Sequence, residues 1–332
     1  MVKVSILVAV YNAAAYLRQC LDSLCRQTLT DLEIICIDDA STDSSPQILR
    51  EYQQCDPRLR LITLSENSGQ ARARNEGLAV ARGEYVCFLD SDDWFSADAL
   101  ERMVERFETD AEVDCVLFKV VNHYSPTHET AYPMTAFDTL SGEAAFEQSL
   151  TWAIHGVYGA RRVLHQRYPY DTTHRAYSDD NTTRLHYLAA RKVAYCQGTY
   201  YYRQHTASVT HAISVRRFDH LLANRDMKTY LQRLGVAERL LNRYEVVRWL
   251  NVVDLYFFYF QHRHQLLPAD RQRGLQIIRT CWASIEVDRL PRKLKRKLGY
   301  APFRGMWWAF RLEEEIYFRL RQLVGRNKER NT

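Results

Sequence analysis

The chain has 332 residues, 46% of them hydrophobic, which suffices for one large domain or two modest ones with a substantial core. A formal net charge of +5 does not by itself indicate nucleic-acid binding, and no nucleic-acid partner is predicted. No secretory leader opens the chain, and no apolar stretch has membrane-spanning length. The eight cysteines form no C-x-x-C pair, which favours buried free thiols and a cytoplasmic location.

Strand-like and helix-like segments alternate over the first 121 residues. Strands are expected at 2–10, 32–37, 59–64, 84–89 and 113–121, and helices at 14–27, 45–54, 69–81 and 97–107. Such alternation requires crossover connections between parallel strands. It predicts an α/β fold with a Rossmann-like, mostly parallel, doubly wound sheet flanked by helices.

The pattern changes after residue 121. Residues 122–142 are expected to form a polar, proline-containing loop, and after a mixed region a further strand is expected at 199–203. From residue 215 onward the apolar positions have helical spacing. We therefore predict one domain over 1–212 and a helical, basic C-terminal region over 213–332. Within that region, the apolar stretch 246–260 contains Arg248 and Asp254, which predicts a buried or interfacial helix.

An acidic cluster follows one of the predicted strands. Asp90, Ser91, Asp92 and Asp93 come directly after the apolar run 85–89. Ligands of open α/β sheets bind at the carboxyl ends of strands. Mg²⁺ typically takes one or two carboxylates and keeps substrate phosphates as further ligands. The cluster therefore predicts a site for a metal ion and a diphosphate.

Four further motifs accompany the acidic cluster in register, at 8–12 (VAVYN), 38–43 (DDASTD), 67–77 (NSGQARARNEG) and 81–85 (ARGEY). In this order and spacing, roughly the first 210 residues resemble a family 2 glycosyltransferase with a GT-A fold, of the bacterial surface-polysaccharide or lipopolysaccharide type. The resemblance implies a nucleotide-sugar-binding half over 1–121 and an acceptor and catalytic-base half over 122–212.

The resemblance also implies which residues bind the donor. Tyr11 would stack on the base, and Asp39 would accept a hydrogen bond from uracil. The alternative for 38–43 is capping of the next helix by Asp43 or Ser44. The donor-binding set implied by the family is Val10, Tyr11, Asp38, Asp39, Gly69, Arg74, Asn75, Asp90, Ser91 and Arg203.

Family members of this kind hold Mn²⁺ or Mg²⁺ with the D-x-D acids, here Asp90 and Asp92, and the ion stabilises the departing nucleoside diphosphate. By the same resemblance His205 completes the metal site; the alternative for this histidine is a structural role. Asp93 is expected behind the ligands or as a helix cap.

A second acid pair, Asp179 and Asp180, matches the family's Glu-Asp motif at a helix start, with Asp179 in place of the usual Glu. The resemblance makes Asp180 the general base that deprotonates the acceptor hydroxyl, with Asp179 as the neighbouring charge. The alternative is that both acids merely favour the helix N-terminus. Trp152 and His155 stand where family members shape the acceptor pocket.

The last 47 residues, from Glu286, hold 13 Lys and Arg against 6 Asp and Glu. Basic residues beside the amphipathic, aromatic-rich segment at 307–323 suit an anionic membrane surface, and we expect the contact within 286–325. The alternative is a helix packed on the protein, and the acidic run 313–315 weakens the membrane interpretation. The sequence EVVRW at 245–249 is a near match to the Q-x-x-R-W signature of processive polysaccharide synthases, which we interpret as coincidence.

Taken with the resemblance, these residues predict an inverting, metal-dependent glycosyltransferase. It would move a sugar from a nucleotide donor, UDP-linked, to a hydroxyl of a growing glycan or glycolipid such as lipopolysaccharide, capsule or exopolysaccharide. It would be cytoplasmic, with peripheral contact to the inner face of the membrane as an open alternative; an oligomer is also left open. The rival functions are a non-catalytic nucleotide-sugar-binding scaffold and a nucleotidyltransferase. The segment 11–15 lacks the glycine and basic residue of nucleotidyltransferase phosphate loops.

Overall fold

The computed structural model of the protein describes residues 1–174, 177, 179–204 and 213–323. Contacts along the chain group into two compact units, residues 1–208 and 209–332. The predicted domain boundary after residue 212 falls on a segment outside the described residues, and so does the predicted metal ligand His205.

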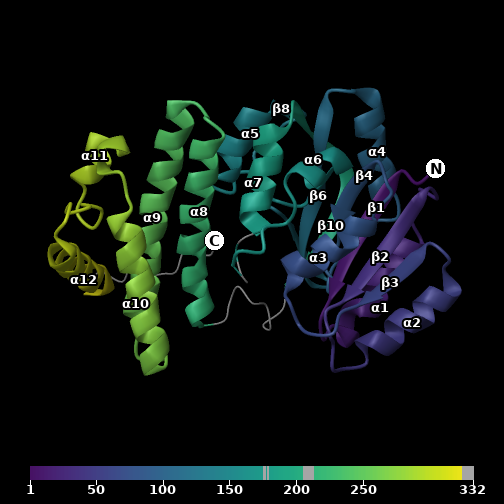
Figure 1. Ribbon diagram of the computed structural model, residues 1–332, viewed down its shortest axis with the longest axis horizontal. Helices are drawn as coiled ribbons and strands as arrows, with labels where there is room; N and C mark the ends of the chain where they lie inside the picture. The colour runs from purple at the N-terminus through teal and green to yellow at the C-terminus, as the bar shows by residue number, and fades with distance from the viewer. Residues whose placement is uncertain (175–176, 178, 205–212, 324–332) are drawn as a thin grey trace. The chain divides into compact units, whose positions relative to one another are not determined.

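The first unit is built on a mixed sheet with the order β3-β2-β1-β4-β9-β6-β10-β5 (Figure 1). Strands β3, β2, β1, β4, β6 and β10 run in one direction, while β9 and β5 run in the other. The strands are β1 (Val4–Val10), β2 (Leu32–Asp38), β3 (Leu59–Thr63), β4 (Tyr85–Phe88), β5 (Trp94–Phe95), β6 (Val113–Ser125), β7 (His128–Ala131), β8 (Thr139–Ser141), β9 (Tyr158–Arg161) and β10 (Lys192–Arg203).

Both faces of this sheet are covered, as expected for strands joined by crossover helices. Along β1, Ile6 and Val8 pack into one core layer with leucines of α1, whereas Leu7 packs into the opposite layer with Ala73 of α3. The helices of the unit are α1 (Ala14–Cys25), α2 (Ser45–Cys55), α3 (Gln70–Val80), α4 (Ala99–Thr109), α5 (Gly142–Ser149), α6 (Arg162–Arg167) and α7 (Asp179–Ala189).

The expectation of a loop over 122–142 is wrong. Strand β6 continues to Ser125, β7 pairs with it antiparallel, and β8 pairs with β10. All four residues of β7 are exposed, and two of the three residues of β8 are exposed as well. These strands are held by backbone hydrogen bonds rather than by buried side chains, so they carry no apolar alternation for a sequence pattern to detect.

The second unit is helical, with its own core around Trp249, Tyr256, Phe310 and Phe318. The predicted buried helix is confirmed, because 246–260 lies in α9 with Val252, Val253 and their neighbours buried. No helix among the described residues is long and apolar enough to cross a membrane. The elements are η2 (Val215–Phe218), α8 (Asp219–Arg233), α9 (Glu238–His262), α10 (Pro268–Ala283), η3 (Val287–Arg289), α11 (Arg292–Lys295) and α12 (Trp307–Leu323).

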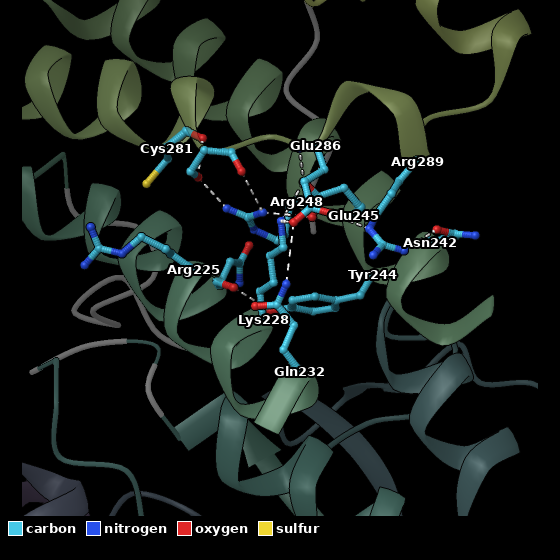
Figure 2. Close-up of polar contacts among 12 residues, drawn as sticks. Arg225, Lys228, Gln232, Asn242, Tyr244, Glu245, Arg248, Cys281, Glu286 and Arg289 are labelled. Atoms are coloured by element: carbon cyan, nitrogen blue, oxygen red, sulfur yellow. Dashed lines mark hydrogen bonds and ion pairs between the residues drawn. The ribbon is translucent and has the colours of Figure 1, made fainter. Parts of the chain in front are cut away.

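A buried polar network joins the helices of this unit (Figure 2). The Glu245 carboxylate, 1% exposed, accepts hydrogen bonds from Lys228 at 3.2 Å and from Arg248 at 2.8 Å. Arg248 also donates to the Ser284 hydroxyl, and the Trp249 indole donates to the carbonyl of Tyr300. The motif at 245–249 therefore has a structural role within the helical core.

Candidate active site

The loops that follow β1 and β2 are joined to each other at the carboxyl edge of the sheet. The amide of Asp39 donates to the Val10 carbonyl at 2.8 Å, and the Asn12 side chain accepts from the Thr42 amide at 2.7 Å. Asn12 and Ala40 both have a left-handed backbone, with φ of 51° and 59°. We call these two hydrogen-bonded loops, residues 11–13 and 39–44, the ledge. Tyr11 lies on the ledge with 49% of its surface exposed.

The two acids at the end of β2 turn inward to support this ledge. Asp39 is buried and accepts from the amides of Ser68 at 2.7 Å and Gly69 at 2.8 Å, which fixes the start of α3. Asp38 accepts from the Ser41 amide at 3.0 Å. The N-cap of α2 is Ser44, whose side chain makes no capping hydrogen bond, and the preceding Asp43 accepts from the Ser45 amide at 2.9 Å. The contacts of Asp39 are made with the start of α3 instead.

Asp90 lies where β4 ends, next to β1, and is held by α3. Its Oδ1 accepts from Arg74 at 2.6 Å and from Gln70 at 2.7 Å. The Arg74 guanidinium is buried and lies 3.9 Å from the centroid of the Phe88 ring. Burial raises the pKa of Asp90, with Arg74 opposing and the charges of Asp92 and Asp179 adding to the rise. Both of these hydrogen bonds fall on the same carboxylate oxygen of Asp90, Oδ1.

Residues at the end of β10 hydrogen-bond the acidic turn, by which we mean residues 90–93. Asp93 is fully buried and accepts from the Tyr200 hydroxyl at 2.6 Å and the Arg203 amide at 2.8 Å. Burial, together with the charges of Asp90 and Asp92, raises the pKa of Asp93 to about 8. Asp93 is therefore no helix cap, since α4 begins at Ala99.

Arg203 lies beside the same turn. Its Nε donates to the carbonyl of Asp92 at 2.8 Å, and its guanidinium stands between the rings of Tyr16 and Trp94, 4.9 and 4.6 Å from their centroids. The cation is held by these two rings, by the Asp92 carbonyl and by the Gln19 side chain, whose oxygen accepts from Arg203 Nη2 at 2.6 Å. It suits neutralisation of a phosphate charge.

The acid pair at the start of α7 lies within electrostatic reach of Asp90. The charge of Asp179 raises the pKa of Asp90 and that of Arg74, although these residues are far apart in sequence. Burial raises the pKa of Asp180 to about 7, with Arg184 opposing and Asp179 adding to the rise. The fold thus brings the two acidic motifs together at one edge of the sheet.

Arg184 stands one helical turn after Asp180. Its Nη2 lies 4.0 Å from Asp180 Oδ2, and its buried guanidinium lies 5.1 Å from the Trp152 ring centroid. Trp152 itself has a left-handed backbone, with φ of 54°. Neither Arg184 nor Gln70 was among the predicted site residues. The i, i+4 spacing of Asp180 with Arg184, and of Gln70 with Arg74, was the available signal.

Two predicted residues have mainly internal partners. The Asn75 side chain bonds the amide of Tyr170 at 2.9 Å and its carbonyl at 2.8 Å, which ties the chain before α7 to α3. His155 is buried, and burial lowers its pKa to about 4. A donor contact by Asn75 and an acceptor contact by His155 remain predictions.

The residues present fit a divalent cation shared with a diphosphate. No group of three or more His, Cys, Asp or Glu in the described part of the chain could hold a metal ion by itself. Asp90 and Asp92 carry the hard oxygen atoms that such an ion prefers, and the hydrogen bonds from Gln70 and Arg74 to Asp90 both fall on Oδ1. Mg²⁺ binds in this way, through one or two carboxylates plus substrate phosphates.

The family model described as Glycosyl transferase family 2 matches residues 5–171, about half of the chain. The chain belongs to this family. The match includes the ledge, the start of α3 and the acidic turn, so the predicted family and its enzyme class are confirmed.

Solved structures confirm the GT-A fold of this family 2 member. The crystal structure of S. aureus TarS 1–349 in complex with UDP-GlcNAc is similar with a TM-score of 0.74 at 19% identity, over 96% of this chain and 92% of that one. The mannosyltransferase PcManGT from Pyrobaculum calidifontis, in complex with GDP-Man and Mn²⁺, gives a TM-score of 0.55 at 20% identity, over 98% and 88%.

Curated relatives are similar over shorter stretches. The poly(ribitol-phosphate) beta-glucosyltransferase of Bacillus spizizenii is 32% identical over 206 residues, which are 60% of this chain and 32% of that protein. In the first curated relatives the match covers 36% of the relative's length or less.

Proposed function

We propose that this family 2 glycosyltransferase transfers a sugar from a nucleoside diphosphate donor to a hydroxyl of a growing surface glycan, with inversion at the anomeric carbon. The proposal rests on one observation above the others. The acidic turn at Asp90 and the acid pair at Asp179 and Asp180 act on each other at the carboxyl edge of the sheet. A single-displacement transfer needs a leaving-group site and a general base close together in space, on opposite sides of the anomeric carbon.

Each group has a role in the proposed reaction. Asp180, ionised, takes the proton of the acceptor hydroxyl as its oxygen attacks the anomeric carbon, and the nucleoside diphosphate leaves from the opposite side. Arg203 and the turn at Asp90 to Asp92 hold the diphosphate, with Asp90 and Asp92 as the ligands of Mn²⁺ or Mg²⁺. When bound, the ion supplies charge neutralisation for the leaving group. Tyr11 offers an exposed ring for the base, and Val10, Asp38, Asp39, Gly69 and Ser91 are the remaining residues proposed to line the donor site.

The donor is proposed to carry UDP, as in the TarS complex with UDP-GlcNAc. Polysaccharide or teichoic-type acceptors follow from the poly(ribitol-phosphate) glucosyltransferase among the relatives, and lipopolysaccharide or capsule remain within the same class. The cytoplasmic location, the contact of the C-terminal segment with a membrane and any oligomer also remain proposals.

Replacing Asp180 by Asn tests the assignment of the base. The amide keeps the shape of the side chain but cannot take the proton, so we expect the transfer rate to fall by about 10²–10⁴-fold while the donor still binds. Transfer is measured as nucleoside diphosphate release with a saccharide acceptor, and donor binding by calorimetry. Asp110→Asn, which alters an exposed carboxylate paired with Lys192, is the control.

An Asp180→Asn variant with wild-type turnover would contradict the base assignment. A wild-type protein that binds the donor without turnover would instead support the scaffold function. Release of pyrophosphate from a nucleoside triphosphate supplied with a sugar 1-phosphate would identify a nucleotidyltransferase.

A further inference from the structure

The outer face of α12 carries a row of exposed apolar side chains. Trp308, Leu312, Ile316 and Leu320 follow one another at intervals of four residues, and Leu323 lies on the same face. Their exposed fractions lie between 48% and 84%. The opposite face of α12 packs into the helical core through Phe310 and Phe318. We call these five exposed residues the apolar row.

The acidic run 313–315 does not interrupt this row. The Glu313 carboxylate accepts from the amide of Gly299 at 3.2 Å, and Glu314 is fully buried. Glu315 pairs with three arginines, Arg263, Arg311 and Arg319, at 3.4, 3.5 and 3.7 Å. The three acids therefore turn inward or are outnumbered by cations. The objection that this run raised against a membrane contact does not hold in the structure.

Basic side chains flank the apolar row on both sides. On one side, Gly299 bonds Glu313 and lies against the Tyr317 ring, which places the segment 292–298 along α12. That segment exposes Arg292, Lys293, Arg296 and Lys297. On the other side stand the three arginines around Glu315. The row is thus an apolar strip with a positive rim.

We propose that the apolar row and its basic rim bind an anionic lipid surface. The apolar side chains would enter the interface between headgroups and acyl chains, and the rim would contact the lipid phosphates. A second copy of the chain fits less well, because pairing two such faces would bring two positive rims together. The inference goes beyond the proposed transfer reaction and does not depend on it, since lipid binding needs no donor or acceptor.

Co-sedimentation of the full chain with vesicles tests the proposal. Vesicles of phosphatidylcholine alone are compared with vesicles that also contain phosphatidylglycerol. We expect binding to the anionic vesicles, weaker binding to the neutral ones, and loss of binding as salt is raised. Replacing Lys293 and Arg296 by Gln should weaken binding by about fivefold for each charge removed. Replacing Leu312 and Ile316 by Gln should weaken it by about tenfold or more.

Matched variants separate the row from exposed surface in general. Leu234→Gln with Leu267→Gln removes two exposed apolar side chains elsewhere in the unit. Arg271→Gln with Arg273→Gln removes two exposed charges on α10. Both control proteins should bind as the wild type does. All four substituted positions of the test variants are exposed, and circular dichroism checks that each variant keeps its helical content.

Three results would overturn the proposal: no sedimentation with anionic vesicles, equal binding by the row variant and the wild type, or wild-type self-association that the row variant abolishes. The last result would assign the face to a second copy of the chain. Because the assay contains no nucleotide, a failed transfer assay leaves its outcome unaffected.

Discussion

At the scale of single residues, the protonation of Asp180 controls the proposed chemistry. Its pKa of about 7 exceeds the usual value because the carboxyl is buried beside Asp179, and Arg184 limits the rise. A general base must be ionised to act. We therefore expect kcat/KM to be constant above about pH 7 and to fall about tenfold for each pH unit below it.

The pH profile of donor turnover measures this directly. Arg184→Met removes the opposing cation, so its acid limb should move to higher pH, while the profile of Asp110→Asn should match that of the wild type. A rate that stays constant down to pH 5 would contradict the role of Asp180.

Ala40 offers a second test at this scale. Its φ of 59° lies in the left-handed region, which costs a residue with a side chain about 1–2 kcal/mol and costs glycine almost nothing. The greater freedom of glycine in the unfolded chain offsets part of this gain, so Ala40→Gly should stabilise the protein by a net amount of about 0.5–1 kcal/mol. Urea unfolding measures the gain. Ala79→Gly, at an exposed position in the last turn of α3, should instead destabilise it by up to about 0.5–1 kcal/mol.

From the sequence, Asp90, Asp180 and Arg74, which donates to Asp90, could be proposed for the candidate site, but not the other partners of the two acids. Asp90 and Asp180 follow a strand and begin a helix, and such positions can be recognised from local pattern. Their partners Gln70 and Arg184 are ordinary polar residues on helices, recognisable only through i, i+4 spacing. The hydrogen bond from Tyr200 to Asp93 joins positions 107 apart in sequence, and only the folded sheet brings them together.

At the scale of elements, α9 is tied to its neighbours through Glu245. The carboxylate is buried with Lys228 and Arg248 as partners (Figure 2). Glu245→Ala would remove the carboxylate partner of the buried Arg248 cation, which costs about 3–5 kcal/mol, while Lys228 would keep its pair with Glu286 at 2.7 Å. The free energy of unfolding in urea measures the loss. Asp288→Ala is the matched control, because its pair with Arg304 is exposed and worth about 0–1 kcal/mol. A small, equal effect of both changes would show that the network does not stabilise the unit.

The strands that the sequence pattern did not predict were missed for two different reasons. Strand β9 has four residues and lies between β4 and β6, and β7 exposes every side chain. Apolar periodicity detects an element only when the element buries one face. The long first strands and α9 meet that condition, and their positions were predicted well.

At the scale of the whole chain, the alternation of strands and helices was sufficient to predict a mostly parallel, doubly wound sheet, because crossover connections leave few ways to arrange it. The GT-A fold itself was implied by the family resemblance of the motifs. What the alternation could not give is the direction of β9 and β5, since both are short and antiparallel to their neighbours. The parallel order β3-β2-β1-β4 brings the ledge and the acidic turn to one edge, which is the basis of the donor site proposed above.

The proposed metal-dependent UDP-sugar site can be tested by thermal unfolding of the purified chain with nucleotides and metal. UDP, GDP, CDP and ADP are added one at a time with Mn²⁺, and then with EDTA in place of the metal. A ligand at about a hundred times its Kd should add about 2.7 kcal/mol of stability. We expect a rise in Tm with UDP that EDTA abolishes and that Asp92→Asn largely removes. An equal or absent shift with all four nucleotides, with and without Mn²⁺, would contradict a metal-dependent UDP-sugar site.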